Sequence, residues 1–518
     1  MQANSNKNNR VPNPKRIGLV LCLAMIFFPV FISGCAVGPD YTGVQPEPRK
    51  DWVAQMEKGL EASQPERDSV SKWWEVYGDP VLAELEKRAV EGNLDLKTAY
   101  SRLCQARINR GISRSEFYPA LDGSGSAQRL QSSESMPTVY GADDMDHYIA
   151  QFDSSWELDV FGGIRRSVQA AQAELEASRA DVDDVMTSLM AEVALNYIEV
   201  RTYQHRLEIT RENIEIQQKT YEMNTSRYEA GLIDELAVKQ SLRNLERTRS
   251  TVSRLKSGLR AAKNRLAVLL GLEPGLIDEK LTPAEPIPQV PAEVAVGIPA
   301  EAMRRRPDIR RAERRVAAQT ARIGMATAEL YPKFHLLGTI GLEALDVESQ
   351  FFDARSQFWN IGPGVSWKIF HGRALRLNIE LQTEKQKEAL IQYKSAVLHA
   401  QEEIENALTA YAKEQMREAS LAKAVSAAKR TEFLARDRFK AGLADFYNVM
   451  DAQRSLLELE DELVQSRGQV ASNLAGLYKA LGGGWQYYGQ TVGQTEAAGN
   501  PAGSGDGDGA PKKTRGAP

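Results

Sequence analysis

The chain contains one sequence pattern twice. Leu94–Pro119 realigns without a gap on Pro307–Pro332, at an offset of 213 residues (94 to 307). Arg227–Gly271 realigns on Arg438–Gly482, at an offset of 211 residues (227 to 438). A period this long is not that of a solenoid of short repeats. The pattern predicts a duplicated unit of roughly two hundred residues, so the function must use two related copies.

Composition favours long helices over a compact mixed core. Ala, Leu, Glu, Arg and Gln are abundant, 26% of the residues are charged and only 7% are aromatic. The net charge of -4 and the lack of a basic stripe with interleaved aromatics give no support to nucleic-acid binding. The five histidines have no metal-ligand spacing, and no phosphate-binding loop or nucleophile motif occurs. We therefore expect no enzymatic activity, no metal and no cofactor.

The N-terminus has the pattern of a secretory signal. Lys15 and Arg16 precede an apolar run from Ile17 to Ile32, which is too short and too one-sided to predict a membrane span. The run ends in Ile-Ser-Gly-Cys35, which resembles a bacterial lipobox. This resemblance implies removal of residues 1–34 and acylation of Cys35. An ordinary signal peptide that happens to contain a cysteine is the alternative.

The residues around this cysteine bear on location and redox chemistry. Ala36 follows Cys35 where an Asp would favour retention in the inner membrane, so the resemblance favours the outer membrane. Cys104 is then the one cysteine left unmodified in the mature chain, which can form no internal disulfide. Because it lies in a helical pattern, we expect Cys104 to be buried as a small apolar residue.

Each repeat also contains a region of period two, which indicates strands. Apolar residues alternate with polar ones from Tyr148 to Val160, from Phe334 to Leu342 and from Trp359 to Trp367. A weaker, Gly- and Ser-rich candidate runs from Leu121 to Leu130. Each repeat thus offers two strands of about ten residues. Trp156, Trp359 and Trp367 suit positions near a membrane interface, although plain strand packing accounts for them equally well.

Long helices follow the strands in both repeats. Helical pattern without proline runs from about Arg165 to Arg227 and then to Leu270, and again from Leu375 to Phe439 and from Asp445 to Leu481. The first of these segments would be a helix of roughly 90 Å. Helices this long and polar must pack lengthwise against each other as coiled coils.

Four strands, each with one apolar face, cannot form a closed sheet in lipid by themselves. A sheet in lipid must close on itself, because open edges leave backbone groups unpaired. Closed membrane barrels have at least about eight strands, so several chains would have to contribute to one barrel. The alternative is a soluble β-domain.

Several motifs together resemble the TolC-like outer-membrane channel family, in the lipoprotein branch of OprM- and NodT-type efflux components. They are Cys35–Tyr41 (CAVGPDY), Trp73-Trp74 with Asp79-Pro80, Arg306–Ile309 (RPDI), Asp451–Arg454 (DAQR) and Leu477–Trp485 (LYKALGGGW). The resemblance implies a mainly α fold with a small membrane β part and a duplicated β-β-α-α repeat. It also implies a homotrimer, with a shared twelve-stranded transmembrane β-barrel and antiparallel coiled-coil helices that form a periplasmic tunnel.

The implied function is that of a passive exit duct, lipid-anchored in the outer membrane. Its partners would be a periplasmic adaptor (membrane fusion) protein and an inner-membrane pump of the proton-driven resistance-nodulation-division type. The exit duct of a peptide or protein secretion system and a lipid-anchored periplasmic coiled-coil scaffold are the alternatives. The transported substrate is set largely by the pump and cannot be read from this chain.

The resemblance divides the chain into six segments. Residues 1–34 form the signal peptide, 35–92 the lipid anchor and N-terminal equatorial segment, and 272–306 a Pro-rich linker. The first repeat, 93–271, holds a helix, two barrel strands at about 121–161 and a helix pair at 165–271. The second, 307–482, holds a helix, strands at about 333–370 and a helix pair at 374–482. Residues 483–518 form a C-terminal equatorial segment and a disordered tail.

The turns between the long helices are the expected docking sites. Gly231 and Gly442 occupy equivalent positions in these turns, where a glycine in the left-handed conformation ends a helix. By resemblance these hairpin tips meet the adaptor. The docking residues are then Arg227, Leu232, Arg438 and Leu443, together with the two glycines.

The expected gate lies on the helix after the second tip. Asp451 and Arg454 are three residues apart, which by itself predicts an ordinary surface ion pair. By resemblance this segment lies where the tunnel narrows, so three Asp451 side chains would repel near one axis unless each had a partner such as Arg454. Tyr447 would face the same constriction. The first-repeat equivalents are Leu236, Gln240 and Arg243, and since Gln240 replaces the carboxylate, one acidic ring is expected.

Overall fold

The computed structural model describes residues 36–44, 51–54, 56–57, 59–61, 63, 70–131, 144–291, 293–347 and 351–487. The signal peptide, Cys35 and residues 488–518 lie outside the described residues, so the expectations for them stay predictions.

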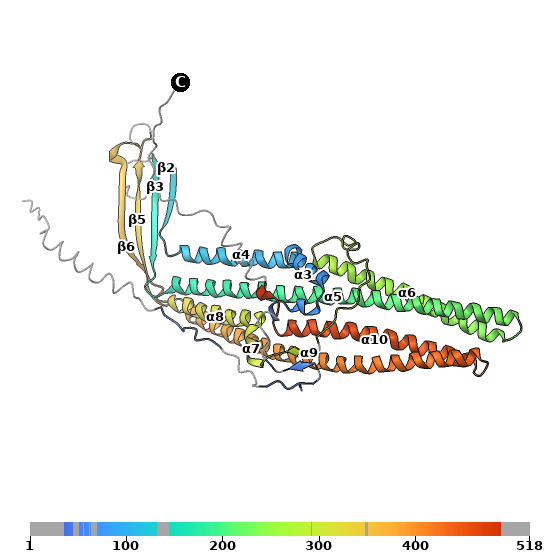
Figure 1. Cartoon of the computed structure of the whole chain (residues 1–518). Coiled ribbons are helices and arrows are strands. Elements are labelled where there is room, and N and C mark those ends of the chain that lie inside the picture. Colours follow the sequence, from blue (N-terminus) through green and yellow to red (C-terminus); the bar gives the residue numbers. More distant parts are fainter. Residues whose placement is uncertain are drawn as a thin grey trace, which may run out of the picture. The chain divides into compact units, whose positions relative to one another are not determined.

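The two repeats contain the same elements in the same order (Figure 1). In the first, α4 (Leu94–Ser115) leads to β2 (Ala120–Gln131), β3 (Asp144–Leu158), α5 (Gly163–Glu229) and α6 (Glu235–Leu269). In the second, α8 (Pro307–Ala328) leads to β5 (Lys333–Ala344), β6 (Gln357–Ser366), α9 (Ala374–Lys440) and α10 (Phe446–Ala480). Matching helices have equal lengths of 22, 67 and 35 residues. The predicted mainly α fold with a duplicated β-β-α-α pattern is confirmed.

Short elements complete the chain. They are β1 (Leu60–Glu61), η1 (Trp73–Tyr77), α3 (Pro80–Gly92), β4 (Val294–Ala295), α7 (Pro299–Arg305) and η2 (Ala354–Ser356). The parallel pair of β1 and β4 and the helix α7 give local structure to the proline-rich segment between the repeats.

The chain folds as two compact units that do not coincide with the repeats. The first unit contains the described residues up to 46, Ala99–Asp181 and Asp308–Leu398. The second contains those from 47 to Thr98, Val182–Pro307 and those from His399 on. Each unit thus combines sequence from both repeats. All four long strands belong to the first unit, and both turns between long helices belong to the second.

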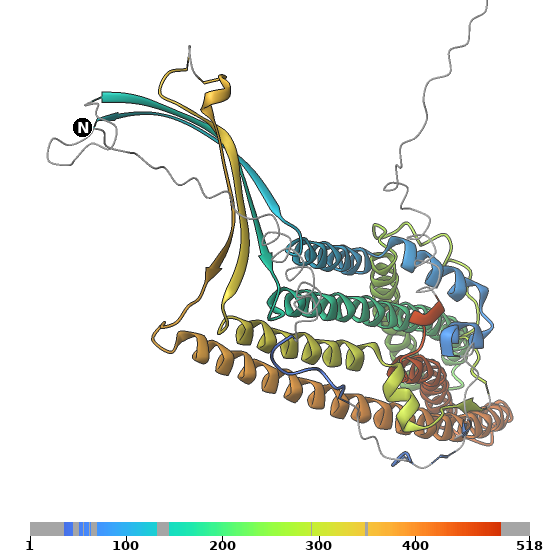
Figure 2. The same cartoon turned by 90° about the vertical axis from the view of Figure 1, so that its left-hand side faces the viewer.

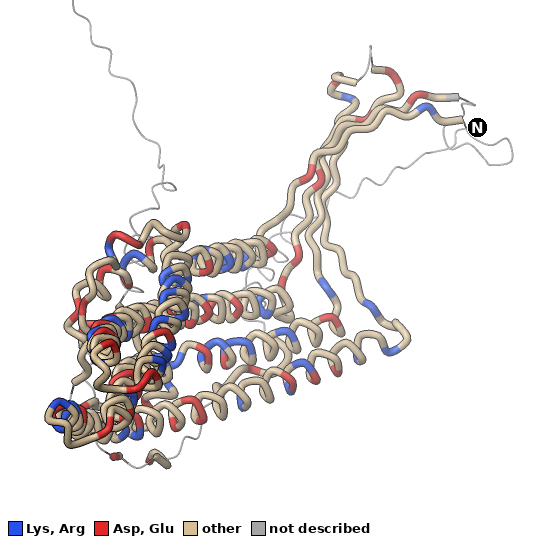
Figure 3. Tube along the Cα trace, turned by 90° about the vertical axis from the view of Figure 1, so that its right-hand side faces the viewer, with Lys and Arg blue, Asp and Glu red and all other residues tan. Residues whose placement is uncertain are grey.

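The four long strands form one antiparallel sheet in the order β2-β3-β5-β6, a curved ribbon in Figure 2. The register aligns Phe152, Ile340 and Trp359 in one row across the sheet, and Asp153, Thr339 and Asn360 in the next. Successive residues point to opposite faces of a strand, so one row lies on an apolar face and the other on a polar face. The predicted alternation is confirmed, and Figure 3 shows fewer charged residues along the strands than along the helices.

The strand ends differ from the sequence expectation. Alternation predicted strands as far as Val160 and Trp367, but β3 stops at Leu158 and β6 at Ser366. The carboxylate of Asp159 accepts from the backbone N–H groups of Ile164 and Arg165, at 3.0 and 2.9 Å. This contact turns the chain into α5 because it satisfies amides that a helix start leaves free. At 15 residues β3 is longer than expected, and β2 is a full strand despite its glycines because every residue of it pairs with β3.

Two tryptophans occupy equivalent positions in the repeats. The indole N–H of Trp156 donates to the carbonyl of Phe117, just after α4, at 2.9 Å. That of Trp367 donates to the carbonyl of Leu330, just after α8, at 3.0 Å. Each tryptophan therefore ties a strand to the end of the preceding helix, in agreement with the strand-packing explanation.

The core of the second unit is held by buried aromatic and polar side chains. The ring of Trp73 stacks on that of Tyr478 at 5.7 Å. The Arg201 guanidinium is 1% exposed and donates to the carbonyl of Pro283 and to the carboxylate of Glu285, both at 2.7 Å. Since Pro283 and Glu285 belong to the segment between the repeats, Arg201 fixes that segment to α5.

The cysteine expectation was wrong. Cys104 is an exposed free thiol on α4, whereas its neighbour Leu103 is buried. The helical pattern did not reveal which face of α4 packs, because α4 in the single chain buries only a narrow stripe. Within the described part of the chain, no helix combines the length and apolarity needed to cross a bilayer.

Candidate functional site

The two turns between long helices have the same backbone geometry. Gly231 and Gly442 have φ of 72° and 73°. The amide of Leu232 donates to the carbonyl of Arg227 at 2.9 Å, and that of Leu443 donates to the carbonyl of Arg438 at 2.8 Å. Such left-handed glycine caps are the expected helix endings, and they hold each turn in one shape.

These turns present apolar side chains to solvent. The exposed fractions of Leu232 and Leu443 are 70% and 79%. At the second turn, Phe439 of α9 and Phe446, Val449 and Met450 of α10 form a buried cluster. The guanidinium of Arg227 lies over the Phe439 ring at 4.9 Å, so the first tip packs against the second. The second unit therefore has an end where two exposed leucines lie on packed helix tips.

The residues of the expected gate share one face of α10. Tyr447, Asp451 and Arg454 are spaced i, i+4 and i+7, and all three are exposed. Arg454 donates to a carboxylate oxygen of Asp451 at 2.7 Å. With side chains 55% and 50% exposed, this pair in a single chain is a surface contact that contributes about 0.2–1 kcal/mol.

The first repeat carries the equivalent face on α6 with different chemistry. Leu236 is 61% exposed and Arg243 is exposed, while Gln240 is half-buried. The cap of α6 is also stronger, because the carboxylate of Asp234 accepts from the amide of Ala237 at 3.2 Å. The equivalent Asp445 makes no such side-chain contact.

The sequence analysis did not predict an ion pair that joins α5 to α10, beyond the expected gate residues along α10. Arg206 of α5 binds Asp461 of α10 through two contacts of 2.7 and 3.0 Å. Both side chains line a cavity of about 200 Å³, together with Arg454 and residues of α6. No sequence signal could have joined two positions so far apart, although each carries a charge inside a helical pattern.

One carboxyl group in the second unit has an unusual environment. Glu86 on α3 is fully buried, and neither of its oxygens has a hydrogen-bond partner. Burial raises the pKa of this carboxyl well above its usual range. Burial also raises the pKa of the nearby Tyr478 hydroxyl to about 12. Among the described residues, no group of three or more His, Cys, Asp or Glu could hold a metal ion.

Comparison with known proteins defines the class. The sequence model of the family "Outer membrane efflux protein" matches residues 85–272 and 298–483. Nodulation protein T of Rhizobium leguminosarum bv. trifolii is 30% identical over 460 residues, which are 89% of this chain and 96% of that protein. The solvent efflux pump outer membrane protein SrpC of Pseudomonas putida is 28% identical over 465 residues, 89% of this chain and 97% of SrpC.

Solved structures agree with the sequence comparison. The outer-membrane channel OprN has a TM-score of 0.80 and 33% identity, with 87% of this chain and 99% of OprN covered. The open state of the Neisseria gonorrhoeae MtrE channel has a TM-score of 0.77 and 27% identity, with 87% and 99% covered. The chain is an outer-membrane channel component by fold. It belongs to the outer membrane efflux protein family, as the motifs of the sequence predicted.

Proposed function

We propose that this protein is the exit duct of a tripartite efflux system, anchored by an acylated Cys35 and closed into a barrel by three copies. The observation that carries the proposal is the open sheet. Within the described residues, β2 and β6 each have one strand neighbour. Lipid cannot hydrogen-bond such edges, so the sheet needs a second copy on each side. Three copies supply twelve strands, enough for a closed membrane barrel.

The partners follow from the ends of the long helices. The exposed Leu232 and Leu443 suit contact with the helical tips of a periplasmic adaptor, which in turn engages an inner-membrane pump of the proton-driven resistance-nodulation-division type. The chain carries no recognisable site for energising transport, so the pump has to supply the energy. The substrates are small organic molecules, as with relatives named for toluene, antibiotic and pyoverdine export.

The gate is the face of α10 that carries Tyr447, Asp451 and Arg454. In the trimer, three copies of this face approach one axis, and the like charges of Asp451 are held by Arg454, 2.7 Å away in the same chain. Engagement of the adaptor moves the helix ends and breaks this arrangement. The first repeat contributes Leu236, Gln240 and Arg243, which add no carboxylate.

Two other functions are less well supported. A coiled-coil scaffold needs no sheet with one apolar face, and the family match covers the strands as well as the helices. A duct for peptide secretion would use the same fold, but the relatives named for a transported compound export small molecules.

The test is a measurement of assembly and conductance on one preparation. Light scattering of the detergent-solubilised protein, corrected for bound detergent, should give three chains per particle. The same particles in a planar bilayer should conduct in small, discrete steps. A single chain per particle would overturn the duct, because four strands cannot close alone. Trimers without conductance, even when the gate face is altered, would favour the scaffold.

A further inference from the structure

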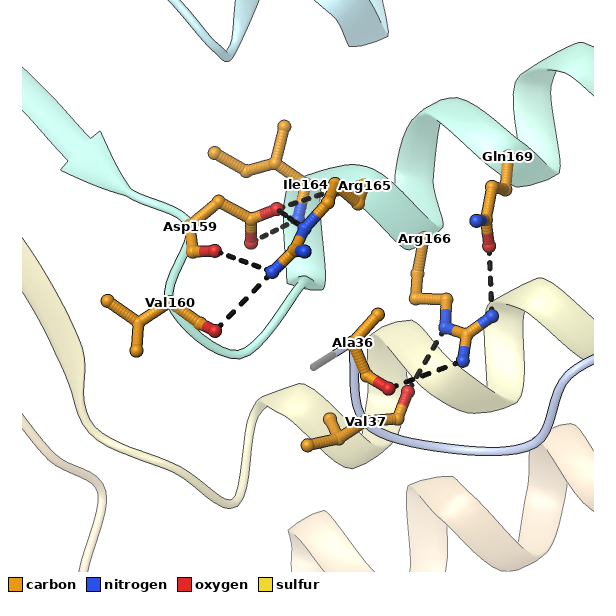
Figure 4. A network of polar contacts seen from close by, with 8 residues as sticks. All are labelled: Ala36, Val37, Asp159, Val160, Ile164, Arg165, Arg166 and Gln169. Atoms are coloured by element: carbon orange, nitrogen blue, oxygen red, sulfur yellow. Dashed lines mark hydrogen bonds and ion pairs between the residues drawn. The ribbon is translucent and has the colours of Figure 1, made fainter. Parts of the chain in front are cut away.

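The residues that follow Cys35 are held by one buried arginine of the first unit. Arg166 lies in the first turn of α5 and its side chain is 3% exposed. Its guanidinium donates to the carbonyls of Ala36 and Val37, at 3.5 and 3.1 Å (Figure 4). It donates to the carbonyl of Gly38 as well, at 3.2 Å. It also donates to Gln169 at 2.9 Å and pairs with Asp40 at 2.8 Å. The five donors of a guanidinium suit this array of carbonyl oxygens.

Backbone hydrogen bonds and aromatic contacts hold the rest of the segment. The amide of Val37 donates to the carbonyl of Phe161 at 3.1 Å, so the segment is tied to the turn between β3 and α5. The Phe161 ring stacks on that of Tyr331 at 4.6 Å. Further along, the hydroxyl of Tyr41 donates to Glu313 on α8 at 3.0 Å, and its ring packs against alanines of α5 and α8.

Two glycines outside the segment, Gly162 and Gly324, make room for it. A Cβ on Gly162 would lie 2.6 Å from the Cα of Ala36, and a Cβ on Gly38 would lie 2.5 Å from the Cα of Gly324. A Cβ on Gly324, near the C-terminal end of α8, would lie 2.8 Å from the side chain of Arg166. Glycine inside a helix is less favourable than alanine, so close approach explains its presence here.

The second repeat shows that these features are not needed by the turn itself. The equivalents of Gly162 and Arg166, at the offset of 211, are Arg373 and Leu377. Arg373 has φ of 67°, close to the 79° of Gly162, so this backbone conformation accepts a Cβ. Leu377 is 51% exposed, and its aliphatic side chain lacks the hydrogen-bond donors of a guanidinium. The duplicated fold therefore differs at Gly162 and Arg166, two of the positions that touch the N-terminal segment.

We propose that Arg166, Gly162 and Gly324 form a socket for residues Ala36–Asp40, and that this socket sets the place where the acylated Cys35 enters the membrane. The inference rests on the lipidation included in the proposed function. Cys35 directly precedes Ala36 in the sequence, so the lipid would be attached one residue before a segment that is bound to the turn between β3 and α5. Arg166 is a positioning residue, because it fixes the segment that follows the acylated Cys35 and does not bind the lipid itself.

The test uses the full-length protein purified from membranes. Hydrogen exchange, read by mass spectrometry, reports the Val37 amide, and the mass of the N-terminal peptide reports its acylation. Arg166→Ala removes the guanidinium, while Gly324→Ala pushes it aside and favours the helix that carries the new side chain. Arg322→Ala is the matched control, since Arg322 pairs with Glu174 at 2.9 Å in the same unit.

We expect the Val37 amide to exchange about tenfold faster or more in both socket variants, because local opening controls exchange of a protected amide. The control and the acyl mass should match the parent protein. Equal Val37 exchange in the parent and both variants would overturn the socket. An unacylated Cys35 in the parent protein would overturn the placement of a lipid, even if the variants still accelerate exchange.

Discussion

Arg206 and Asp461 lie 255 positions apart in the chain and join α5 to α10 by two parallel contacts, 2.7 and 3.0 Å long. The Arg206 side chain is 15% exposed and that of Asp461 is 31% exposed, so water screens this pair less than the Asp451–Arg454 pair, whose side chains are 50% and 55% exposed. Asp461 lies on α10, the helix that carries the expected gate residues, and the pair is closer to the core of the second unit than those residues are. The contact therefore ties the gate-bearing helix to the other repeat.

Removal of this pair should destabilise the second unit. A charge-assisted, two-point contact contributes about 1.5–3 kcal/mol. We expect Arg206→Ala and Asp461→Ala each to lower the free energy of unfolding by an amount in this range, with a clear coupling energy in the double-mutant cycle. The Glu246–Arg249 pair, 2.7 Å long and exposed, is the control cycle and should give a few tenths of a kcal/mol. Equal coupling in both cycles would contradict the assignment.

Loss of the Asp451 carboxylate should open the channel. Asp451→Ala removes the acidic ring and leaves Arg454 without its partner, so the closed arrangement is weakened. We expect higher single-channel conductance and faster entry of a bulky antibiotic into cells. Glu246→Ala deletes a carboxylate of another exposed i,i+3 pair on α6 and should leave both readouts unchanged. Unchanged conductance and leakage in Asp451→Ala would remove this residue from the gate.

Charge at the tips should block coupling to the pump without harming the channel. Leu232→Asp and Leu443→Asp place a carboxylate where an apolar contact is expected, and a buried unpaired charge is strongly unfavourable. We expect ethidium to accumulate in cells of the native host as it does in a strain lacking the protein, while trimer mass and bilayer conductance stay normal. Leu276→Asp changes an equally exposed leucine away from the tips and should export normally. Normal export by both tip variants would rule out these leucines as docking residues.

The buried carboxyl of Glu86 should make the second unit less stable at high pH. Its pKa in the folded protein is raised well above the ordinary value near 4.5, so the folded state holds a proton that the unfolded state releases. Stability is then greatest below pH 4.5 and falls as the pH rises toward the folded-state pKa. Glu86→Gln should remove this dependence and raise the melting temperature at pH 7.5 more than at pH 5.

The neighbouring Glu84 supplies a control of opposite sign. Its pKa is lowered by its hydrogen bond and charge pair with Lys280, so its contribution is present above pH 4.5 and is lost as the pH falls. Glu84→Gln should therefore matter less at low pH than at neutral pH. A melting temperature of Glu86→Gln that follows the parent protein at every pH would mean that Glu86 is ionised in the folded state.

The local elements of this protein follow from patterns within its amino-acid sequence. Helix bounds followed from long proline-free periodic segments, strands from alternation, and the turns from Gly231 and Gly442. Because the pattern is duplicated, each element is indicated in both repeats. The weak, glycine-rich β2 could therefore be placed from its counterpart in the second repeat. These signals are local, since they depend on neighbours within a few residues in the chain.

The contacts between residues far apart in the chain depend on how the helices and strands pack. The pairing of Arg206 with Asp461, the grip of Arg166 on Ala36–Asp40 and the exposure of Cys104 each depend on which helix faces pack together. A helical period marks an apolar stripe but does not say what covers it. Charged residues in such a pattern look alike in sequence. Whether one of them forms a structural ion pair or stays a solvated surface charge depends on a partner that can be hundreds of positions away.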